Sequence, residues 1–272
     1  MAKEKSERKD RLFYQQKNGY ELIDEEEREL LEAYCRGYMS FLDGAKTERE
    51  AVKSAIALAE NKGFVPYKAG MELKPGTKIY SSNRGKALML AVIGKKPLSE
   101  GAVIAAAHVD SPRLDLKQVP VYEDNEICYF KTHYYGGIKK YQWLTIPLEL
   151  HGVIALKNGE TLEICIGKDE SDPVFQITDL LPHLNKEQRK KTADEFVPGE
   201  NLNIIIGTIP DKEDVTDKVK LAVLDLLNKK YGITEEDFLS AELTAVPAYP
   251  VREVGFDRSL IAGYGHDDRV CA

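Results

Sequence analysis

Apolar residues recur at helical spacing in three parts of the chain. In residues 24–42 apolar and aromatic side chains lie three or four positions apart, after a run of acidic residues. A second helix is expected directly afterwards, because Thr47 and Glu50 have the spacing of a capping box and an alanine-rich face follows them. The third helix is predicted for residues 214–232, where a glycine ends the periodic pattern.

Between the second and third helices the pattern becomes that of strands. Residues 78–82, 87–94 and 102–110 are expected to be strands. The last two are nearly continuous apolar runs, typical of strands that helices cover on both faces, and they predict an α/β sheet. Beyond Pro112, shorter alternating segments predict a separate antiparallel lobe. Its strands are expected at 127–132, 144–156 and 161–167.

The rest of this region gives weaker signals. Residues 201–210 and 238–249 are also expected to be strands, and the polar stretch 183–196 has a helical tendency. The whole chain has 272 residues. Because a single domain typically has about 100 to 150 residues, we expect two lobes or one domain with an insertion.

Composition excludes several classes of protein. Hydrophobic residues make up 43% and charged residues 31%, and no apolar run approaches the roughly 20 residues that a membrane span needs, so no membrane association is predicted. The start, MAKEKSERKDRLFY, lacks the apolar core of a secretory signal, which predicts a cytoplasmic protein. A net charge of -7 gives no electrostatic basis for nucleic-acid binding.

The cysteines are expected to be reduced thiols. They lie far apart and form no CxxC pair, which argues against a structural zinc site or a disulfide framework. They are Cys35, Cys128, Cys165 and Cys271.

The first candidate site is the HVD tripeptide that ends the apolar run 102–110. On a strand, His108 and Asp110 would point to the same face, at the strand end where open α/β sheets place their sites. Such a histidine can ligate a divalent metal while the nearby carboxylate orients it and raises its basicity. The alternative is a strand end that opens a turn through Ser111.

The second candidate is the HDDR sequence at residues 266–269. Two adjacent acidic residues followed by an arginine can supply a carboxylate that ligates a metal, a second carboxylate beside it and a charge that orients both. A carboxylate can also bridge two metals about 3.5 to 4 Å apart. The alternative is a solvated polar turn. Taken together, histidine and aspartate without cysteine suit a catalytic zinc, cobalt or manganese site. Further ligands would be needed, and none is evident in the sequence.

Other polar positions are ambiguous or carry no claim. The Gly-Gly pair in YYGGIKKYQW (134–143) predicts a tight turn and lacks the phosphate-loop pattern, so nucleotide binding there is rejected. His183 is either a substrate contact or a surface residue. No function is assigned to His133 or His151.

These segments resemble a known family. The stretch AVIAAAHVDSPRLDLK is similar to the HTDSP metal motif of the aspartyl aminopeptidase and vacuolar aminopeptidase I family of dinuclear metallo-aminopeptidases. The resemblance covers nearly the whole chain and is closest to the bacterial branch, in which the late cluster reads DDR. It continues through YSSNRGKALMLAVIG, YGGIKKYQWLTIPLELHGVI, LLPHLNKE and AELTAVPAYPVREVGFDRSLIAGYGHDDRVCA.

The resemblance implies roles for individual residues. His108 is similar to the histidine ligand of one metal, and Asp110 to the catalytic-site carboxylate beside it. Asp267 corresponds to the carboxylate that bridges both metals, with Asp268 and Arg269 next to it. The implied cofactors are two divalent metal ions, zinc first, with cobalt or manganese as alternatives.

The resemblance also implies a fold and an assembly. The expected fold is an α/β metallopeptidase domain with a mixed sheet (1–113 and 251–272), interrupted by a β-rich dimerisation domain at 114–250. Family members are homo-oligomers, dodecamers built from dimers, that act on peptides. His183 falls on a family histidine that reaches a neighbouring subunit's site and contacts substrate.

In the family, paired glutamates, an aspartate and a final histidine follow the bridging aspartate, whereas this sequence stops at Ala272. We therefore expect the N-terminal portion of a metal-dependent aminopeptidase that releases N-terminal amino acids from peptides, inactive or nearly so by itself. One rival is a catalytically inactive assembly protein derived from this family. Another is a glycosyl or other hydrolase, which would need paired carboxylates that the sequence does not single out. The preferred N-terminal residue stays open.

Overall fold

The computed structural model describes residues 11–272, so the charged start from which a cytoplasmic protein was predicted lies mostly outside the described residues. The described residues fall into two compact units, which divide between Ser40 and Phe41. Helix α2 (Glu25–Asp43) begins with three glutamates, which interact favourably with the positive end of the helix dipole. The helix predicted for 24–42 is confirmed.

Helix α3 (Glu48–Asn61) begins with the predicted capping box. The Glu50 backbone N–H donates to the Thr47 hydroxyl over 3.3 Å, and the Glu50 carboxylate accepts from the Thr47 backbone N–H over 3.0 Å. A three-stranded sheet follows, with β2 (Lys78–Asn83) between the short parallel β1 (Val65–Pro66) and the antiparallel β3 (Ala87–Val92). The strands predicted at 78–82 and 87–94 are confirmed.

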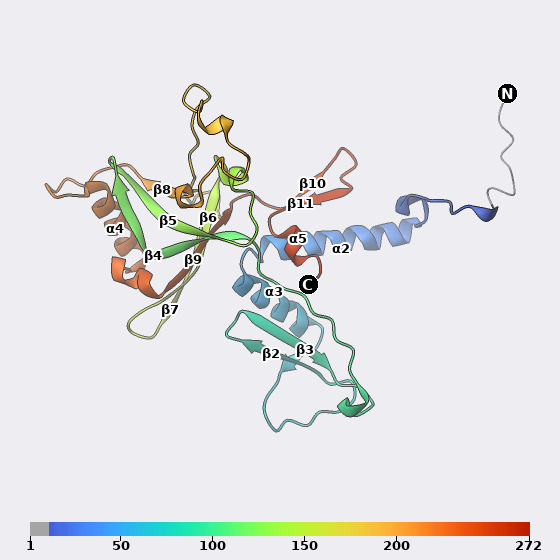
Figure 1. Ribbon diagram of the computed structural model, residues 1–272. Helices are drawn as coiled ribbons and strands as arrows, with labels where there is room; N and C mark the ends of the chain where they lie inside the picture. Colours follow the sequence, from blue (N-terminus) through green and yellow to red (C-terminus); the bar gives the residue numbers. More distant parts are fainter. Residues whose placement is uncertain (1–10) are drawn as a thin grey trace, which may run out of the picture. The chain divides into compact units, whose positions relative to one another are not determined.

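The main sheet has six strands in the order β7-β6-β9-β4-β5-β8, and every neighbouring pair is antiparallel (Figure 1). This agrees with the antiparallel lobe predicted beyond Pro112. The sequence did not reveal the first strand, because an irregularity in register between Leu116 and Val121 interrupts its alternation. The strands are β4 (Arg113–Asp124), β5 (Ile127–Tyr135), β6 (Leu148–Ala155), β7 (Thr161–Ile166), β8 (Ile204–Gly207) and β9 (Ala241–Pro247).

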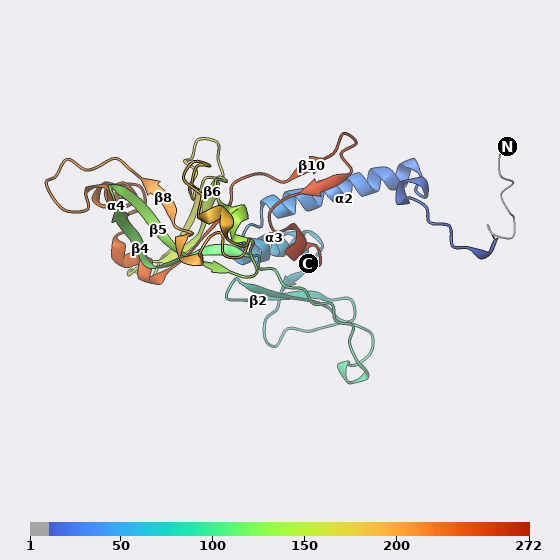
Figure 2. The same cartoon turned by 45° about the horizontal axis from the view of Figure 1, so that its top comes forward.

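The core of the second unit lies between this sheet and helix α4 (Lys218–Tyr231). In both ribbon views α4 lies beside β8 and β5, and it contacts these strands and β4 (Figures 1 and 2). The helix ends at Gly232, as predicted, in the left-handed conformation that glycine adopts most readily. The fully buried side chains include Leu114, Leu148, Ile154, Leu202, Ile204 and Val219.

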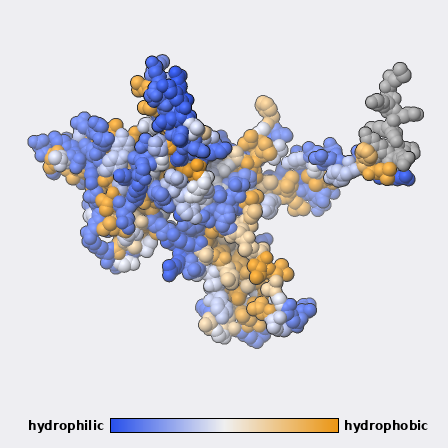
Figure 3. Space-filling model, viewed as in Figure 1, coloured by the Kyte–Doolittle hydropathy of each residue, from blue (hydrophilic) through white to orange (hydrophobic). Residues whose placement is uncertain are grey.

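The strand predicted at 102–110 is wrong. These residues have no regular secondary structure, and Val103 and Ile104 are almost completely exposed. An apolar strand needs neighbouring strands for its backbone groups and cover for its faces, and no segment within residues 11–272 pairs with this one. The helices that were expected to cover β3 are also missing from much of this strand, since Met89 and Val92 are exposed. Apolar residues gather on the surface over β2 and β3 (Figure 3).

The helical tendency of residues 183–196 is realised only as a 3-10 turn, Gln188–Lys190. The stretch has few apolar residues with which to bury one helix face, and packing of such a face supplies most helix stability in proteins. After the main sheet come a two-stranded hairpin, β10 (Arg252–Val254) with β11 (Leu260–Ala262), and the one-turn helix α5 (His266–Arg269). No helix in the described part of the chain is long and apolar enough to cross a membrane.

Candidate metal centre

His108 and Asp110 contact each other although they do not lie on a strand. The His108 Nδ1 atom lies 3.2 Å from the Asp110 Oδ1 atom and 3.1 Å from the Asp110 backbone oxygen. Both acceptors favour the imidazole tautomer with its proton on Nδ1, which leaves the Nε2 lone pair for a ligand. Because 60% of the His108 side chain is exposed, an ion could reach it. The structure thus brings together the first predicted pair.

The other carboxylate oxygen of Asp110 accepts a hydrogen bond from the Tyr135 hydroxyl over 2.7 Å. This hydrogen bond is the main cause that lowers the pKa of Asp110, and it raises the pKa of Tyr135. Tyr135 ends strand β5 and pairs with Arg113, the first residue of β4. Tyr135 was not among the residues predicted from the sequence, where its only signal was an aromatic residue next to the Gly-Gly pair.

The second motif forms helix α5. Gly265 precedes the helix with a φ of 73°, and the Asp267 side chain is exposed while Asp268 is half-buried. Arg269 is only 1% exposed, and its Nη2 group donates to the Lys46 backbone oxygen over 3.1 Å. Burial lowers the pKa of its guanidinium. The alternative of a solvated polar turn is therefore wrong for Arg269, which anchors the helix in the interior.

The two motif segments lie against each other. The Tyr264 hydroxyl donates to the Pro112 backbone oxygen over 2.9 Å. A Cβ atom added to Gly265 would lie 3.0 Å from the hydroxyl oxygen of Ser111, which is buried. The turn that leads into α5 therefore packs on the two residues that follow Asp110. Within residues 11–272, however, no three histidine, cysteine, aspartate or glutamate side chains gather as a metal-binding group.

His183 lies in an exposed turn, away from regular secondary structure. The turn is closed by a hydrogen bond from the Leu184 N–H to the Leu181 oxygen, 2.8 Å long. In the described part of the chain, the His183 side chain has no hydrogen bond or ion pair with the other candidates. Its predicted contact with substrate stays a prediction.

A buried ionic cluster, comprising Lys46, Glu50, Glu149 and His151, joins the start of α3 to β6. The His151 Nδ1 atom lies 2.7 Å from a Glu50 oxygen, and its Nε2 atom lies 3.2 Å from a Glu149 oxygen. Burial alone would lower the pKa of His151, but the contacts of its ring with Cys165, Glu149 and Glu50 raise it to about 11. His151 is therefore protonated at neutral pH. No role for this residue was predicted from the sequence.

Lys46 extends the ionic cluster towards the last residues of the chain. Its ammonium donates to the backbone oxygens of Pro247 and Tyr249, over 3.2 and 3.0 Å, and lies 3.5 Å from Glu149. Its own backbone oxygen accepts the hydrogen bond from Arg269. The ionic cluster and helix α5 thus share one residue.

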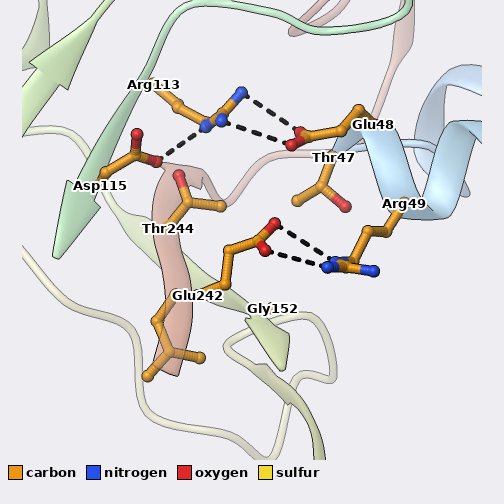
Figure 4. A pocket seen from close by; sticks show the side chains of 9 residues that line it. Thr47, Glu48, Arg49, Arg113, Asp115, Gly152, Glu242 and Thr244 are labelled. Atoms are coloured by element: carbon orange, nitrogen blue, oxygen red, sulfur yellow. Dashed lines mark hydrogen bonds and ion pairs between the residues drawn. The ribbon is translucent and has the colours of Figure 1, made fainter. Parts of the chain in front are cut away.

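A small polar pocket beside α3 contains paired charges (Figure 4). The Arg113 guanidinium lies 3.2 Å from Glu48 and 2.8 Å from Asp115, and Arg49 lies 2.9 Å from Glu242. Since each of these charges has a partner of opposite sign, the pocket ties α3 to β4 and β9 and offers no free charge for catalysis. Arg113 also lies over the Tyr135 ring, 4.5 Å from its centre.

A family model described as "Aminopeptidase I zinc metalloprotease (M18)" matches residues 41–272. A protein of Clostridium acetobutylicum named "Probable M18 family aminopeptidase 1" is 48% identical over 96% of this chain and 57% of its own length. A protein of Thermotoga maritima with the same name is 50% identical over 90% of this chain and 54% of its own length. The chain spans about half the length of the curated relatives it matches.

Solved structures confirm the α/β fold class with mixed sheets. The crystal structure of an M18 aminopeptidase from Thermotoga maritima matches 95% of this chain and 56% of its own chain, with a TM-score of 0.89 and 48% identity. That of aminopeptidase I from Borrelia burgdorferi B31 matches 94% of this chain and 58% of its own, with a TM-score of 0.84 and 43% identity. The resemblance inferred from the sequence is confirmed.

Proposed function

The chain belongs to the M18 family of aminopeptidase I zinc metalloproteases, and we propose that it forms part of a metal-dependent aminopeptidase that releases N-terminal amino acids from peptides. The observation that carries this proposal is the local geometry of the two motifs. Asp110 holds His108 with one ring nitrogen outward, and the turn before Asp267 packs on the residues after Asp110.

The donor chemistry of these residues fits divalent zinc. Imidazole and carboxylate groups are the usual ligands of catalytic zinc, and cobalt or manganese accept the same set. His108 would hold an ion through Nε2, and Asp267 would bridge two ions through its exposed carboxylate. Bound divalent ions polarise a scissile carbonyl and lower the pKa of a coordinated water.

The chain's own residues position these ligands. Asp110 keeps the His108 ring in one orientation, and buried Arg269 fixes the helix that carries Asp267 and Asp268. The remaining ligands and the glutamate base that the resemblance implies would come from the part of the family's length that these 272 residues do not span. On this proposal, residues 1–272 alone have little or no turnover.

The proposal extends to the domains and the assembly. Residues 1–113 and 251–272 would belong to the peptidase domain, and residues 114–250, which hold nearly all of the six-stranded sheet, would form the dimerisation domain. A solved relative from yeast, mApe1, is described as a dodecamer. We expect a cytoplasmic homo-oligomer that acts on peptides, in which His183 reaches the site of a neighbouring subunit.

Activity measurements on the polypeptide encoded by the complete reading frame test the function. We expect zinc-, cobalt- or manganese-dependent release of amino acids from a panel of aminoacyl substrates. His108→Ala and Asp267→Asn should each lower kcat/KM by on the order of 100-fold or more, because each removes a ligand. His133→Ala is the matched control and should keep activity. Unchanged turnover in both ligand variants would refute the assignment.

A further inference from the structure

We propose that Tyr135 is a positioning residue for the candidate metal centre: its hydroxyl fixes the Asp110 carboxylate, which in turn orients the His108 ring. The catalytic consequence rests on the function proposed above. The effect on the His108 ring can be measured without any enzyme activity.

The two oxygens of the Asp110 carboxylate contact different partners. Its Oδ2 atom accepts from the Tyr135 hydroxyl over 2.7 Å, while its Oδ1 atom faces the His108 Nδ1 atom at 3.2 Å. A carboxylate turns easily about its terminal bond, because that torsion has broad minima. With one partner on each oxygen, rotation would break at least one contact. Tyr135 thus sets the plane from which Asp110 meets the imidazole.

The sheet holds Tyr135 in place. The residue is the last of strand β5 and lies directly opposite Arg113 in β4. The Arg113 guanidinium covers the tyrosine ring at 4.5 Å and is itself held by Glu48 and Asp115. Only 12% of the Arg113 side chain is exposed, which strengthens its attraction to the ring face. The hydroxyl is therefore presented by a rigid element.

The glycine after Tyr135 packs against Pro112, which follows Asp110 by two residues, and so provides a second contact with this segment. Gly136 has a φ of 77°, and a Cβ atom added there would lie 3.2 to 3.3 Å from three carbon atoms of Pro112. The backbone after β5 thus approaches Pro112 as closely as the absence of a side chain allows. This contact gives the Gly-Gly pair a structural purpose beyond the tight turn that the sequence predicted.

Such support is needed because His108 and Asp110 lie on an irregular segment. Residues 101–112 form no strand or helix, so no ladder of backbone hydrogen bonds orients His108. Sites on irregular segments are less exact than sites on strands unless neighbouring groups lock their side chains. Tyr135 and Gly136 provide this connection between the sheet and the irregular segment.

The test compares Tyr135→Phe with Tyr134→Phe. The first substitution removes the hydroxyl but keeps the ring beneath Arg113, and the second removes a hydroxyl from the adjacent residue, whose ring stacks on His133. Nitrogen-15 NMR of the histidine rings in the 272-residue chain reports the tautomer of neutral His108, with His108→Gln identifying its signals. We expect the Nδ1–H tautomer in the wild type and in Tyr134→Phe. Tyr135→Phe should shift the population part of the way towards the Nε2–H tautomer, because the Asp110 backbone oxygen, 3.1 Å from the His108 Nδ1 atom, still accepts from it.

A second readout is the affinity for cobalt(II), titrated into the polypeptide of the complete reading frame. We expect Tyr135→Phe to weaken binding about tenfold, as loss of outer hydrogen bonds around metal ligands does. Gly136→Ala, which keeps the hydroxyl but displaces Pro112, should change both readouts. Gly137→Ala should change neither, since a Cβ atom there meets nothing within 4 Å.

A wild-type tautomer population and wild-type cobalt affinity in Tyr135→Phe would overturn the proposal. A shifted tautomer with weakened affinity supports it, even if no variant or wild-type protein releases amino acids. In that case the positioning role stands and the proposed aminopeptidase function fails, so the two failures are distinguishable.

Discussion

His151 carries a positive charge inside the protein because two carboxylates face its ring. Glu50 and Glu149 contact its two nitrogens, Lys46 lies beside Glu149, and Cys165 is its cross-strand partner in β7. Its pKa in the folded protein is about 11, against about 6.5 in an unfolded chain. A raised pKa stabilises the fold fully below pH 6.5, and this contribution is lost as the pH rises towards 11.

We therefore predict that the free energy of unfolding contains a His151 contribution that falls between pH 7 and 10. For one proton the slope is at most about 1.4 kcal/mol per pH unit. Urea unfolding at a series of pH values measures it, with His151→Gln as the comparison. The variant should be less stable at pH 7 and should lose less stability on going to pH 10. Parallel curves for the two proteins would show that His151 is not charged in the folded state.

For single residues, the sequence predicted contacts between residues that are close in the chain but not contacts between residues that are far apart in it. The pairing of His108 with Asp110 was predictable because a single residue separates them, and the contact is present although these residues do not form the predicted strand. Tyr135 was not predictable, since it meets Asp110 only through the register of β4 with β5. Arg269 was read as part of a polar cluster, whereas its burial depends on Lys46, far away in the sequence.

Helices and their caps could be predicted from local sequence signals, whereas the absence of a strand at residues 102–110 could not. The capping box at Thr47 and the glycine that ends α4 act within one turn of chain, so their sequence patterns suffice. The apolar run 102–110 has the composition of a buried strand, but strand formation depends on neighbours that the sequence does not identify. Strand β4 was missed because its register is irregular.

Gly152 allows strands β6 and β9 to approach, which gives a prediction at the level of the element. Its φ is 140°, and an added Cβ atom would lie 1.9 Å from the Glu242 backbone oxygen. We expect Gly152→Ala to lower the free energy of unfolding by about 3 kcal/mol or more, from strain and overlap together. Gly159→Ala is the control, because it also has a positive φ, 88°, but an added Cβ atom meets nothing within 4 Å.

Chemical denaturation measures both glycine variants. Gly159→Ala should cost only about 1 kcal/mol, the part that comes from backbone conformation. Equal losses in the two variants would mean that β6 and β9 do not pack as closely as the structure has them.

On the scale of the whole molecule, buried charged residues support both parts of the candidate metal centre, the segment with His108 and Asp110 and the helix with Asp267. Lys46 connects the ionic cluster to Arg269, which fixes the helix of Asp267. Arg113 connects α3 to Tyr135, whose hydroxyl reaches Asp110. Sequence patterns identified the family and predicted the ligands, whereas these supports come from residues that tertiary structure brings together.

We propose that His108 and Asp267 bind the catalytic metal of an M18 aminopeptidase. The most direct test is anomalous diffraction at the zinc absorption edge, on crystals of the polypeptide encoded by the complete reading frame. We predict an anomalous peak about 2.0 to 2.1 Å from the His108 Nε2 atom and about 2.0 to 2.2 Å from an Asp267 carboxylate oxygen. Zinc bound elsewhere, with neither residue as a ligand, would show that His108 and Asp267 do not form the metal site.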